Sequence, residues 1–271
     1  MNKNTKIILV GGGKMGSALV SGWIKSGISK GNLLVIEPAR ENAAQLQKKL
    51  GVKVLKDSKA ITASFKPDIV VFAVKPQVMG EVAPNYKKFK GAVFLSIAAG
   101  KTIGYFEKRL GKDAAIVRAM PNLPATIGRG ITAMVANKNA SKQQKDACFS
   151  VMEAVGKVLW LKQESQLDAV TAVSGSGPAY VFYFLEAIVR AGTELGLDEA
   201  TARKLACKTF SGAAKLAGNS KDNLADLRKQ VTSPGGTTEA ALKILMEGDG
   251  VGKAIVQAIK AAEKRSAELS D

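Results

Sequence analysis

Eight consecutive residues, from Val231 to Thr238, have the composition of an anion-binding turn. Gly235 and Gly236 free the backbone, hydroxyl side chains add hydrogen-bonding groups, and the residues that follow have the pattern of a helix. A glycine turn that enters a helix directs several backbone N–H groups at one point, where the helix dipole also favours negative charge. We therefore expect a receptor for a small anion, most simply a carboxylate. From these residues alone, an interhelical turn capped by Thr237 is equally compatible with the pattern.

A second glycine cluster follows the apolar run Lys6–Val10. Its glycines have the GxGxxG spacing, in which the first makes a tight turn, the second admits a pyrophosphate, and the third lets helix and strand approach closely. A strand, a glycine turn and the helix-like stretch Ser17–Ser26 occur in the order that dinucleotide binding requires. The loop residues expected to contact the dinucleotide are Gly11, Gly13, Lys14, Met15 and Gly16.

The next apolar run, Leu33–Ile36, ends in an acid that bears on the choice of coenzyme. Glu37 lies 21 residues beyond Gly16, close to the ~20 expected for the acid that binds a ribose hydroxyl. Arg40 is near enough to bind the 2′-phosphate of NADP. The acid favours NADH and the arginine favours NADPH, so the sequence leaves the coenzyme open.

The chain contains no histidine, which excludes several kinds of chemistry together. Ser-His-Asp triads, histidine metal sites and acid catalysis by imidazole are all ruled out. Cys148 and Cys207 fit no metal-ligand or redox spacing, so we expect buried, reduced thiols and no metal site.

These motifs must be positioned by alternating strands and helices. Repeated units of this kind predict a Rossmann-like, doubly wound parallel sheet, which binds ligands at the carboxyl ends of its strands. Ala73–Gln77 and Ala98–Gly100 end two predicted strands and should therefore lie on the ligand side. Met120–Pro124 either aims Asn122 at the ligand or forms a plain structural turn. The strands are expected at Lys6–Val10, Leu33–Ile36, Asp68–Val74, Ala92–Ile97, near Ala114–Arg118 and at Lys157–Leu161, with a helix at Glu41–Leu50.

From Gln163 onward the periodicity is helical throughout, so we expect an α/β domain at residues 1–162 and an all-helical domain at residues 163–271. The stretch Tyr180–Val189 is apolar on nearly every side. Helices of that kind are buried all round, which a helical domain of this size does not provide within one chain. We infer that a second subunit covers it. The helices are predicted at Leu167–Val173, Ala179–Gly196, Asp198–Ala217, Ala225–Val231, Thr238–Met246 and Lys253–Leu269.

The net charge of +17 belongs to the first domain. Residues 1–162 hold 27 Lys and Arg against 9 Asp and Glu, and the remainder holds 13 against 14. A positive field attracts anionic ligands such as dinucleotides, and it would also attract nucleic acid. The lysines are dispersed along predicted helix faces without interleaved aromatic residues, which is typical of solvated surface. No signal peptide or spanning apolar run is evident, so we expect a soluble cytoplasmic protein without membrane partners.

Taken together, these motifs resemble the Δ1-pyrroline-5-carboxylate reductases over essentially the whole chain. The glycine fingerprint is common to many reductases, whereas the last two motifs, in this order and position, are close to diagnostic. The resemblance implies a Rossmann domain, a helical dimerisation domain, and a homodimer that can assemble further into a decamer. The residues that carry it are Gly11–Gly16, Ala73–Gln77, Ala98–Gly100, Met120–Asn122, Asp168–Thr171, Ser174–Tyr180 and Val231–Thr238.

The resemblance also implies site residues. The backbone of Gly236, Thr237 and Thr238 would hold the substrate carboxylate, the Thr238 hydroxyl would contact the ring nitrogen, and Lys75 would border the nicotinamide riboside. Thr237 and Gln230 depart mildly from the alanine and asparagine common in the family. The implied substrate-binding residues are Glu164, Ser176, Gly177, Pro178, Ser233, Gly235, Gly236, Thr237 and Thr238. Beyond the glycine loop, the implied cofactor-binding residues are Glu37, Arg40, Ala73, Val74, Lys75, Pro76, Ala99 and Gln230.

This reaction agrees with the absence of histidine. A cyclic imine protonated on nitrogen is already electrophilic at carbon, so hydride transfer from NADPH or NADH needs no acid to protonate an oxygen. Catalysis then depends mainly on orientation, and Thr238 and Lys75 are the expected catalytic residues.

Two other functions remain open from the residues. One is a related imine or hydroxyacid reductase in which Lys75 is the acid. The other is a basic nucleic-acid-binding protein, which would bind with an affinity that falls steeply with salt.

Overall fold

The computed structural model describes residues 2–269. The chain folds as two compact units. The first contains the residues up to Ser176 together with the C-terminal segment from Ala262, and the second runs from Gly177 to Ala261.

An eight-stranded sheet forms the centre of the first unit, with the strand order β3-β2-β1-β4-β5-β6-β7-β8. Strands β1 to β6 pair in parallel, in the order of a doubly wound dinucleotide-binding fold. The order reverses at β1, which lies between β2 and β4, and this reversal is where such sheets bind their ligands. The strands are β1 (Ile7–Val10), β2 (Leu33–Ile36), β3 (Lys53–Leu55), β4 (Ile69–Phe72), β5 (Val93–Ser96), β6 (Ala115–Met120), β7 (Gly130–Ala136) and β8 (Gly156–Trp160).

The predicted fold class is confirmed, with two departures at the sheet edges. β7 pairs antiparallel with β6, and β8 pairs parallel with β7, so the last two strands run against the others. The short connection through the 3₁₀ turn η5 (Leu123–Ile127) explains this, because a parallel neighbour would need a long crossover. β3 and β7 had not been predicted. β3 is only three residues long and begins with the exposed Lys53, so it lacks an apolar run.

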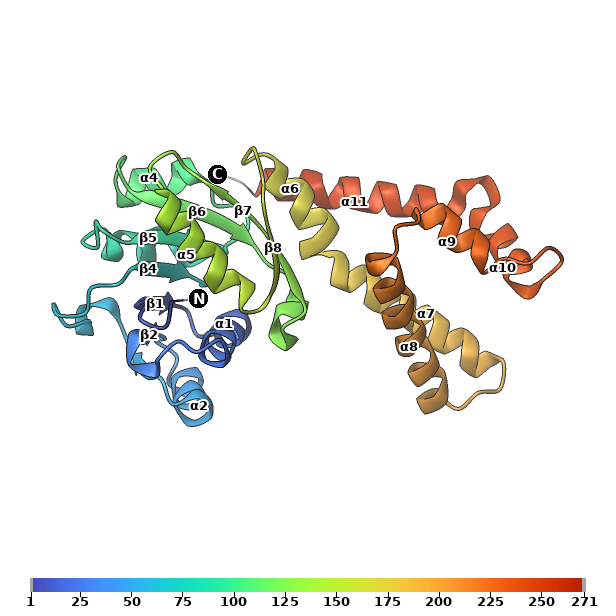
Figure 1. Cartoon of the computed structure of the whole chain (residues 1–271), viewed down its shortest axis with the longest axis horizontal. Helices are drawn as coiled ribbons and strands as arrows, with labels where there is room; N and C mark the ends of the chain where they lie inside the picture. The colour runs from blue at the N-terminus through green and yellow to red at the C-terminus, as the bar shows by residue number, and fades with distance from the viewer. Residues whose placement is uncertain (1, 270–271) are drawn as a thin grey trace. The chain divides into compact units, whose positions relative to one another are not determined.

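Both faces of the sheet are buried under helices (Figure 1). Ile7 and Leu9 of β1 belong to one hydrophobic cluster, and Ile8 and Val10 belong to another on the opposite face. The helices α1 (Lys14–Lys25), α2 (Arg40–Leu50) and α5 (Lys142–Glu153) pack on the first cluster, and α3 (Met79–Val82) and α4 (Ile103–Leu110) pack on the second.

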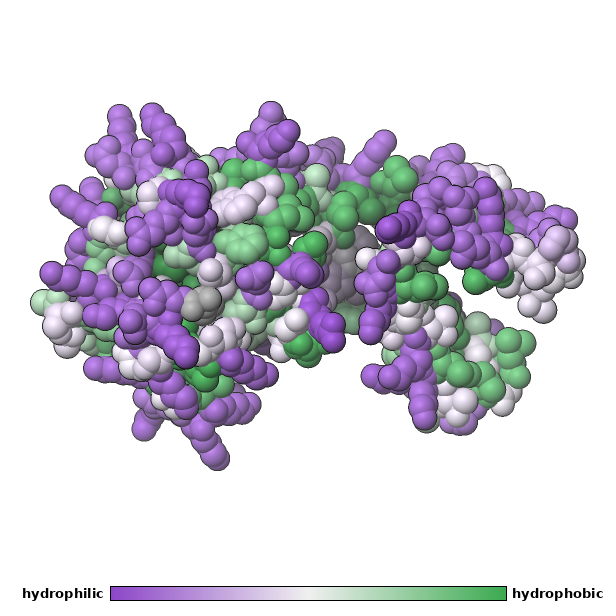
Figure 2. Space-filling view, in the orientation of Figure 1, coloured by the Kyte–Doolittle hydropathy of each residue, from purple (hydrophilic) through white to green (hydrophobic). Residues whose placement is uncertain are grey.

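The second unit is all-helical, as predicted. No residue of α7 is buried within the chain, and Phe182 and Tyr183 are 50% and 70% exposed. Figure 2 shows hydrophobic side chains gathered over α7 and α8, whereas those over the first unit are mainly hydrophilic. By length and composition alone, the helical run Gln166–Glu194 could also cross a membrane. The helices are α7 (Gly177–Glu194), α8 (Glu199–Asn219), α9 (Leu224–Gln230), α10 (Thr237–Met246) and α11 (Gly250–Glu268), whose last turns belong to the first unit.

The division between the units lies further along the chain than the predicted boundary after residue 162. Helix α6 (Gln166–Val170) remains with the first unit because Leu167 packs against Ala133 and Val135 of β7. The two helices predicted on either side of residues 174–178 are joined by a π-helical turn, η6 (Thr171–Gly175), in which the Ser176 N–H donates to the Thr171 carbonyl at 2.8 Å.

Candidate active site

The glycine loop after β1 has one glycine that packing within the first unit does not explain. Gly11 has φ +105°, and a Cβ there would lie 2.7 Å from the Ala73 carbonyl oxygen. A Cβ at Gly16 would overlap the Gly11 carbonyl. At Gly13, which precedes α1, a Cβ would have no atom within 4 Å, so this position is open to a ligand. Helix α1 begins at Lys14, three residues earlier than predicted.

Glu37 fixes the glycine loop against the start of α2. It is 7% exposed, its Oε2 accepts from the Gly12 N–H at 2.7 Å, and its Oε1 accepts from the Ala39 N–H at 2.8 Å. Arg40, the first residue of α2, is exposed beside it. A groove of about 420 Å³ borders the loop, lined by residues that include Gly13, Lys14, Ser17, Asn42 and Lys49. The open glycine and two lysines make this groove suited to an anionic ligand.

The ends of β4 and β5 meet the glycine loop at one edge of the sheet. The Ala73 N–H donates to the Val10 carbonyl at 2.8 Å, and the Ile97 N–H donates to the Phe72 carbonyl at 3.1 Å. Lys75 is exposed and precedes the 3₁₀ turn η3 (Pro76–Val78), in which Pro76 takes the first position as predicted. The sheet therefore brings Ala73–Pro76 and Ala98–Gly100 to the same edge as the glycine loop.

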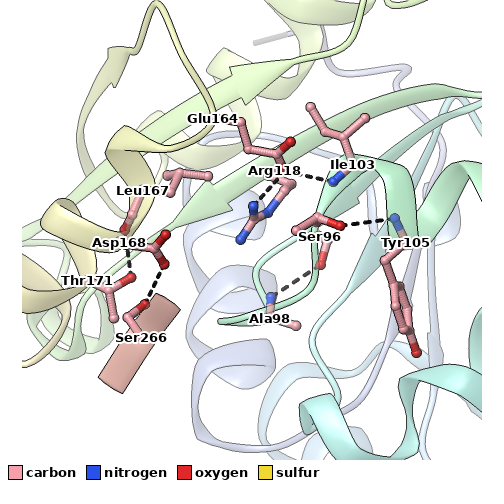
Figure 3. Close-up of polar contacts among 11 residues, drawn as sticks. Ser96, Ala98, Ile103, Tyr105, Arg118, Glu164, Leu167, Asp168, Thr171 and Ser266 are labelled. Carbon is pink, nitrogen blue, oxygen red and sulfur yellow. Dashed lines mark hydrogen bonds and ion pairs between the residues drawn. The ribbon is translucent and has the colours of Figure 1, made fainter. Parts of the chain in front are cut away.

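Glu164 lies in a polar network that the sequence did not reveal (Figure 3). Its Oε1 accepts from the Arg118 guanidinium at 2.6 Å and from the Ile103 N–H at 2.7 Å. Arg118, on β6, is 6% exposed and needs such a partner, because an unpaired buried charge is strongly destabilising. The one available signal was a lone charge within the apolar run Ala115–Met120.

A second carboxylate of the same segment contacts the C-terminal helix α11. Asp168 Oδ1 accepts from the Ser266 hydroxyl at 2.7 Å, and Ser266 is 5% exposed (Figure 3). Nothing in the sequence pattern distinguishes Ser266 from any other small residue on a helix face. Its role emerges only from the fold.

The predicted anion turn in the second unit is an uncapped helix start. Helix α10 begins at Thr237, its N-cap is Gly236, and no side chain caps it, so the alternative of a Thr237 cap is wrong. The Gly235 N–H donates to Glu239 Oε2 at 2.7 Å. Within residues 2–269, the N–H groups of Thr237 and Thr238 have no acceptor. The turn helps to line a hollow of about 590 Å³ that Lys243 also borders.

The other predicted site residues have the following surroundings. Gln230 Nε2 donates to Asp222 at 2.9 Å, and Ser233 accepts from the Gly236 N–H through its carbonyl at 3.0 Å. Ser176 ends the first unit, and Gly177 and Pro178 begin α7 in the second. The side-chain oxygen of Asn122 accepts from the Ile131 N–H at 3.0 Å, which agrees with the alternative of a structural turn.

The two cysteines differ in their surroundings. Cys148 is buried in the core of the first unit, and burial raises the pKa of its thiol. Cys207 is exposed within the single chain, so the prediction that both are buried is wrong for this residue. Residues 2–269 contain no group of three or more acidic, cysteine or histidine side chains that could hold a metal ion.

Two family models match different parts of the chain. Residues 164–269 match the family described as pyrroline-5-carboxylate reductase dimerisation. Residues 6–100 match the family described as NADP oxidoreductase, coenzyme F420-dependent.

Full-length relatives and solved structures are similar over nearly the whole chain. The pyrroline-5-carboxylate reductase of Pseudomonas aeruginosa is 39% identical, over 98% of this chain and 97% of its own length. The structure of a pyrroline-5-carboxylate reductase from Coxiella burnetii has a TM-score of 0.91 and 37% identity and covers 99% of both chains. The Plasmodium falciparum pyrroline carboxylate reductase, solved with NADP bound, has a TM-score of 0.88 and 30% identity and also covers 99% of both chains.

Proposed function

The chain belongs to the pyrroline-5-carboxylate reductase family, and we propose that it transfers a hydride from NADPH or NADH to the C=N bond of 1-pyrroline-5-carboxylate, giving L-proline. The observation that carries this proposal is the uncapped start of α10, where two N–H groups without acceptors and the adjacent Thr238 hydroxyl suit a ring that bears a carboxylate and a nitrogen.

The proposed cofactor residues surround the carboxyl ends of β1, β2, β4 and β5. The open backbone at Gly13 admits a pyrophosphate, and the start of α1 favours its charge. Lys14 and Arg40 supply positive charge, Glu37 fixes the loop, and Ala73–Pro76 with Ala99 would border the nicotinamide riboside. When bound, the dihydronicotinamide supplies the hydride. Gln230 already donates to Asp222, so we give it no direct role.

The proposed substrate residues differ in one detail from those implied by the resemblance. The Gly236 N–H donates to the Ser233 carbonyl, and the Gly235 N–H donates to the Glu239 carboxylate. Thr237 and Thr238 would therefore supply the N–H groups that bind the substrate carboxylate. The hydroxyl oxygen of Thr238 accepts a hydrogen bond from the protonated ring nitrogen. Ser176–Pro178 and Ser233 would form walls of the substrate pocket.

Hydride transfer depends more on how the nicotinamide and the imine are oriented than on acid–base catalysis. Hydride transfer to a protonated imine neutralises a cation, so no side chain must deliver a proton in that step. Lys75 lies next to Ala73 and Val74 and is proposed to orient the nicotinamide end of the cofactor rather than to act as an acid. Holding the two reactants in register is worth several kcal/mol, about 7–11 in well-oriented intramolecular reactions.

The proposed enzyme is a cytoplasmic homodimer, with a decamer as a further assembly, and has neither nucleic acid nor membrane as a partner. The exposed apolar residues of α7 support association, because a second copy would remove them from water. This association also accounts for the apolar character of Gln166–Glu194, so the helical run need not cross a membrane.

The test is to follow oxidation of NADH and NADPH in parallel, with pyrroline-5-carboxylate as substrate and a hydroxyacid panel as the comparison. We expect oxidation with the imine and with at least one coenzyme. Activity with neither coenzyme would overturn the proposal, and turnover of hydroxyacids alone would favour the hydroxyacid reductase.

A further inference from the structure

The segment that begins at Glu164 carries two carboxylates that hold elements bordering one loop of the first unit. This loop, Ala98–Gly100, follows β5 and precedes α4. Ala98 is fixed at its start, because its N–H donates to the buried Ser96 hydroxyl at 3.2 Å.

Glu164 holds the element that follows the loop. Ile103 is the first residue of α4, and its N–H is one of the helix-start donors that has no partner within the helix. Glu164 accepts that N–H at 2.7 Å and is itself fixed by Arg118 at 2.6 Å (Figure 3). The start of α4 is thereby tied to β6.

Asp168 holds the element that lies against the loop. It accepts from Ser266 at 2.7 Å, which fixes the last turns of α11. Leu269, three residues further on, lies against Gly100 so closely that a Cβ at Gly100 would be 2.5 Å from the Leu269 carbonyl oxygen. Gly100 also has φ +72°, which only glycine adopts without strain.

We propose that Glu164 and Asp168 form a two-carboxylate clamp that fixes the Ala98–Gly100 loop in the position that NAD(P)H requires. Arg118 and Ser266 are then positioning residues for hydride transfer, and neither of them touches the substrate. The inference rests on the proposed function, and it gives Glu164 a role in cofactor placement instead of the substrate contact implied by the resemblance. A rigid supporting shell of this kind governs how accurately a site is held.

The Ser266 hydroxyl offers the cleanest test, because its removal leaves Arg118 and Glu164 paired. Ser266→Ala is compared with Ser266→Thr, which retains a hydroxyl, and with Glu268→Ala, which removes an exposed ion pair with Arg265 on the same helix. Each purified full-length variant is titrated with NADPH and with NADH by nicotinamide fluorescence. Steady-state KM values for coenzyme and imine are measured beside the titrations.

We expect Ser266→Ala to raise the coenzyme Kd about fivefold to tenfold, the loss that one hydrogen bond represents, with the imine KM unchanged. Hydrogen exchange at residues 98–103 should be faster in the ligand-free variant. Ser266→Thr should restore both values, and Glu268→Ala should change neither. Asp168→Ala should give the same defect as Ser266→Ala, and the double variant should be no worse than Asp168→Ala alone.

An unchanged coenzyme Kd and unchanged exchange in Ser266→Ala would overturn the clamp. So would a fall in melting temperature without either effect, because that would make the contact purely structural. A wild-type protein that binds NADPH without reducing the imine would instead overturn the proposed function, and the Kd comparison would still decide the clamp.

Discussion

At the scale of single residues, the side chains with proposed roles differ in whether they already have a hydrogen-bond partner within the protein. Glu37, Glu164 and Asp168 all accept hydrogen bonds from the protein itself. The Thr238 hydroxyl has no such partner within residues 2–269, and it follows directly on the unpaired N–H of Thr237. A polar group that the fold leaves unused at a helix start is the one best placed to meet a ligand.

Removing the Thr238 hydroxyl should therefore raise the activation free energy of the reaction more than it lowers the free energy of unfolding. We expect Thr238→Ala to lower kcat/KM about 10- to 150-fold, which corresponds to about 1.5–3 kcal/mol for a hydrogen bond to a charged group. Steady-state kinetics with saturating coenzyme measures this. Thr232→Ala, in the same turn, is the control and should change kcat/KM by no more than about twofold. A Thr238→Ala enzyme with wild-type kcat/KM would remove this residue from the mechanism.

The sequence was informative about backbone sites and silent about side-chain networks. The turn at residues 235–238 and the glycine loop follow from local chemistry, because glycine and hydroxyl spacing determines which N–H groups are exposed. Arg118 and Ser266 meet their carboxylate partners only after β6, α6 and α11 have been brought together, and no local pattern encodes that meeting.

At the scale of elements, the fold requires some glycines of the glycine loop and does not require another. Gly16 is required by the close approach of α1 to the loop, and Gly11 is required by its positive φ and its contact with Ala73. Gly13 has φ −65°, which any residue adopts, and open space around its missing Cβ. Packing among the described residues therefore does not require glycine at this position, whereas the proposed contact with the pyrophosphate would require it.

Alanine at Gly13 should accordingly affect coenzyme binding, and alanine at Gly16 should affect stability. Gly13→Ala should leave the melting temperature within about 1–2 °C of wild type and raise the Kd for NADPH at least tenfold, because its methyl group would fill the space proposed for the pyrophosphate. Gly16→Ala should lower the free energy of unfolding by about 1–3 kcal/mol, because its methyl group overlaps the Gly11 carbonyl. Calorimetry and fluorescence titration measure the two quantities. Equal coenzyme affinity in Gly13→Ala and wild type would place the pyrophosphate elsewhere.

Strand prediction succeeded for the strands that are buried on both faces and for the exposed edge strand β8. β1, β2 and β4 are runs of four buried apolar residues, and β5 has three followed by the buried Ser96; their bounds agree with prediction to within a few residues. β3 lies at the opposite edge, and with three residues that begin at the exposed Lys53 its composition resembles that of a loop. β7 is mostly buried and apolar, so its composition does not explain why the prediction omits it.

At the scale of the whole molecule, the second unit presents more apolar surface than a protein in water normally keeps. The hydropathy of Tyr180–Val189 predicted this, and the structure shows that no residue of α7 is buried within the chain. A helix of that composition is stable in water only if another surface covers it, and a second copy of the same chain supplies one with matching character.

A charge in this surface should oppose the dimer. Phe182 is 50% exposed and borders a groove between α7 and α8. We expect Phe182→Glu to raise the dimer Kd about 10- to 150-fold, since burying a phenylalanine contributes about 1.5–3 kcal/mol. Sedimentation equilibrium measures the Kd. Gln47→Glu introduces the same charge on exposed α2 and should leave it unchanged. If Phe182→Glu dimerised as tightly as the wild type, the dimer contact would have to lie on another face.

In the proposed reaction the hydride goes from nicotinamide to the imine carbon, and isotope transfer follows that hydride. The protein is supplied with coenzyme deuterated at the transferring C4 position and with 1-pyrroline-5-carboxylate, and the product is examined by NMR and mass spectrometry. We predict L-proline with a single deuterium at C5, the former imine carbon, and none at the other ring carbons. Proline without deuterium, or deuterium found only in a hydroxyacid product, would contradict it.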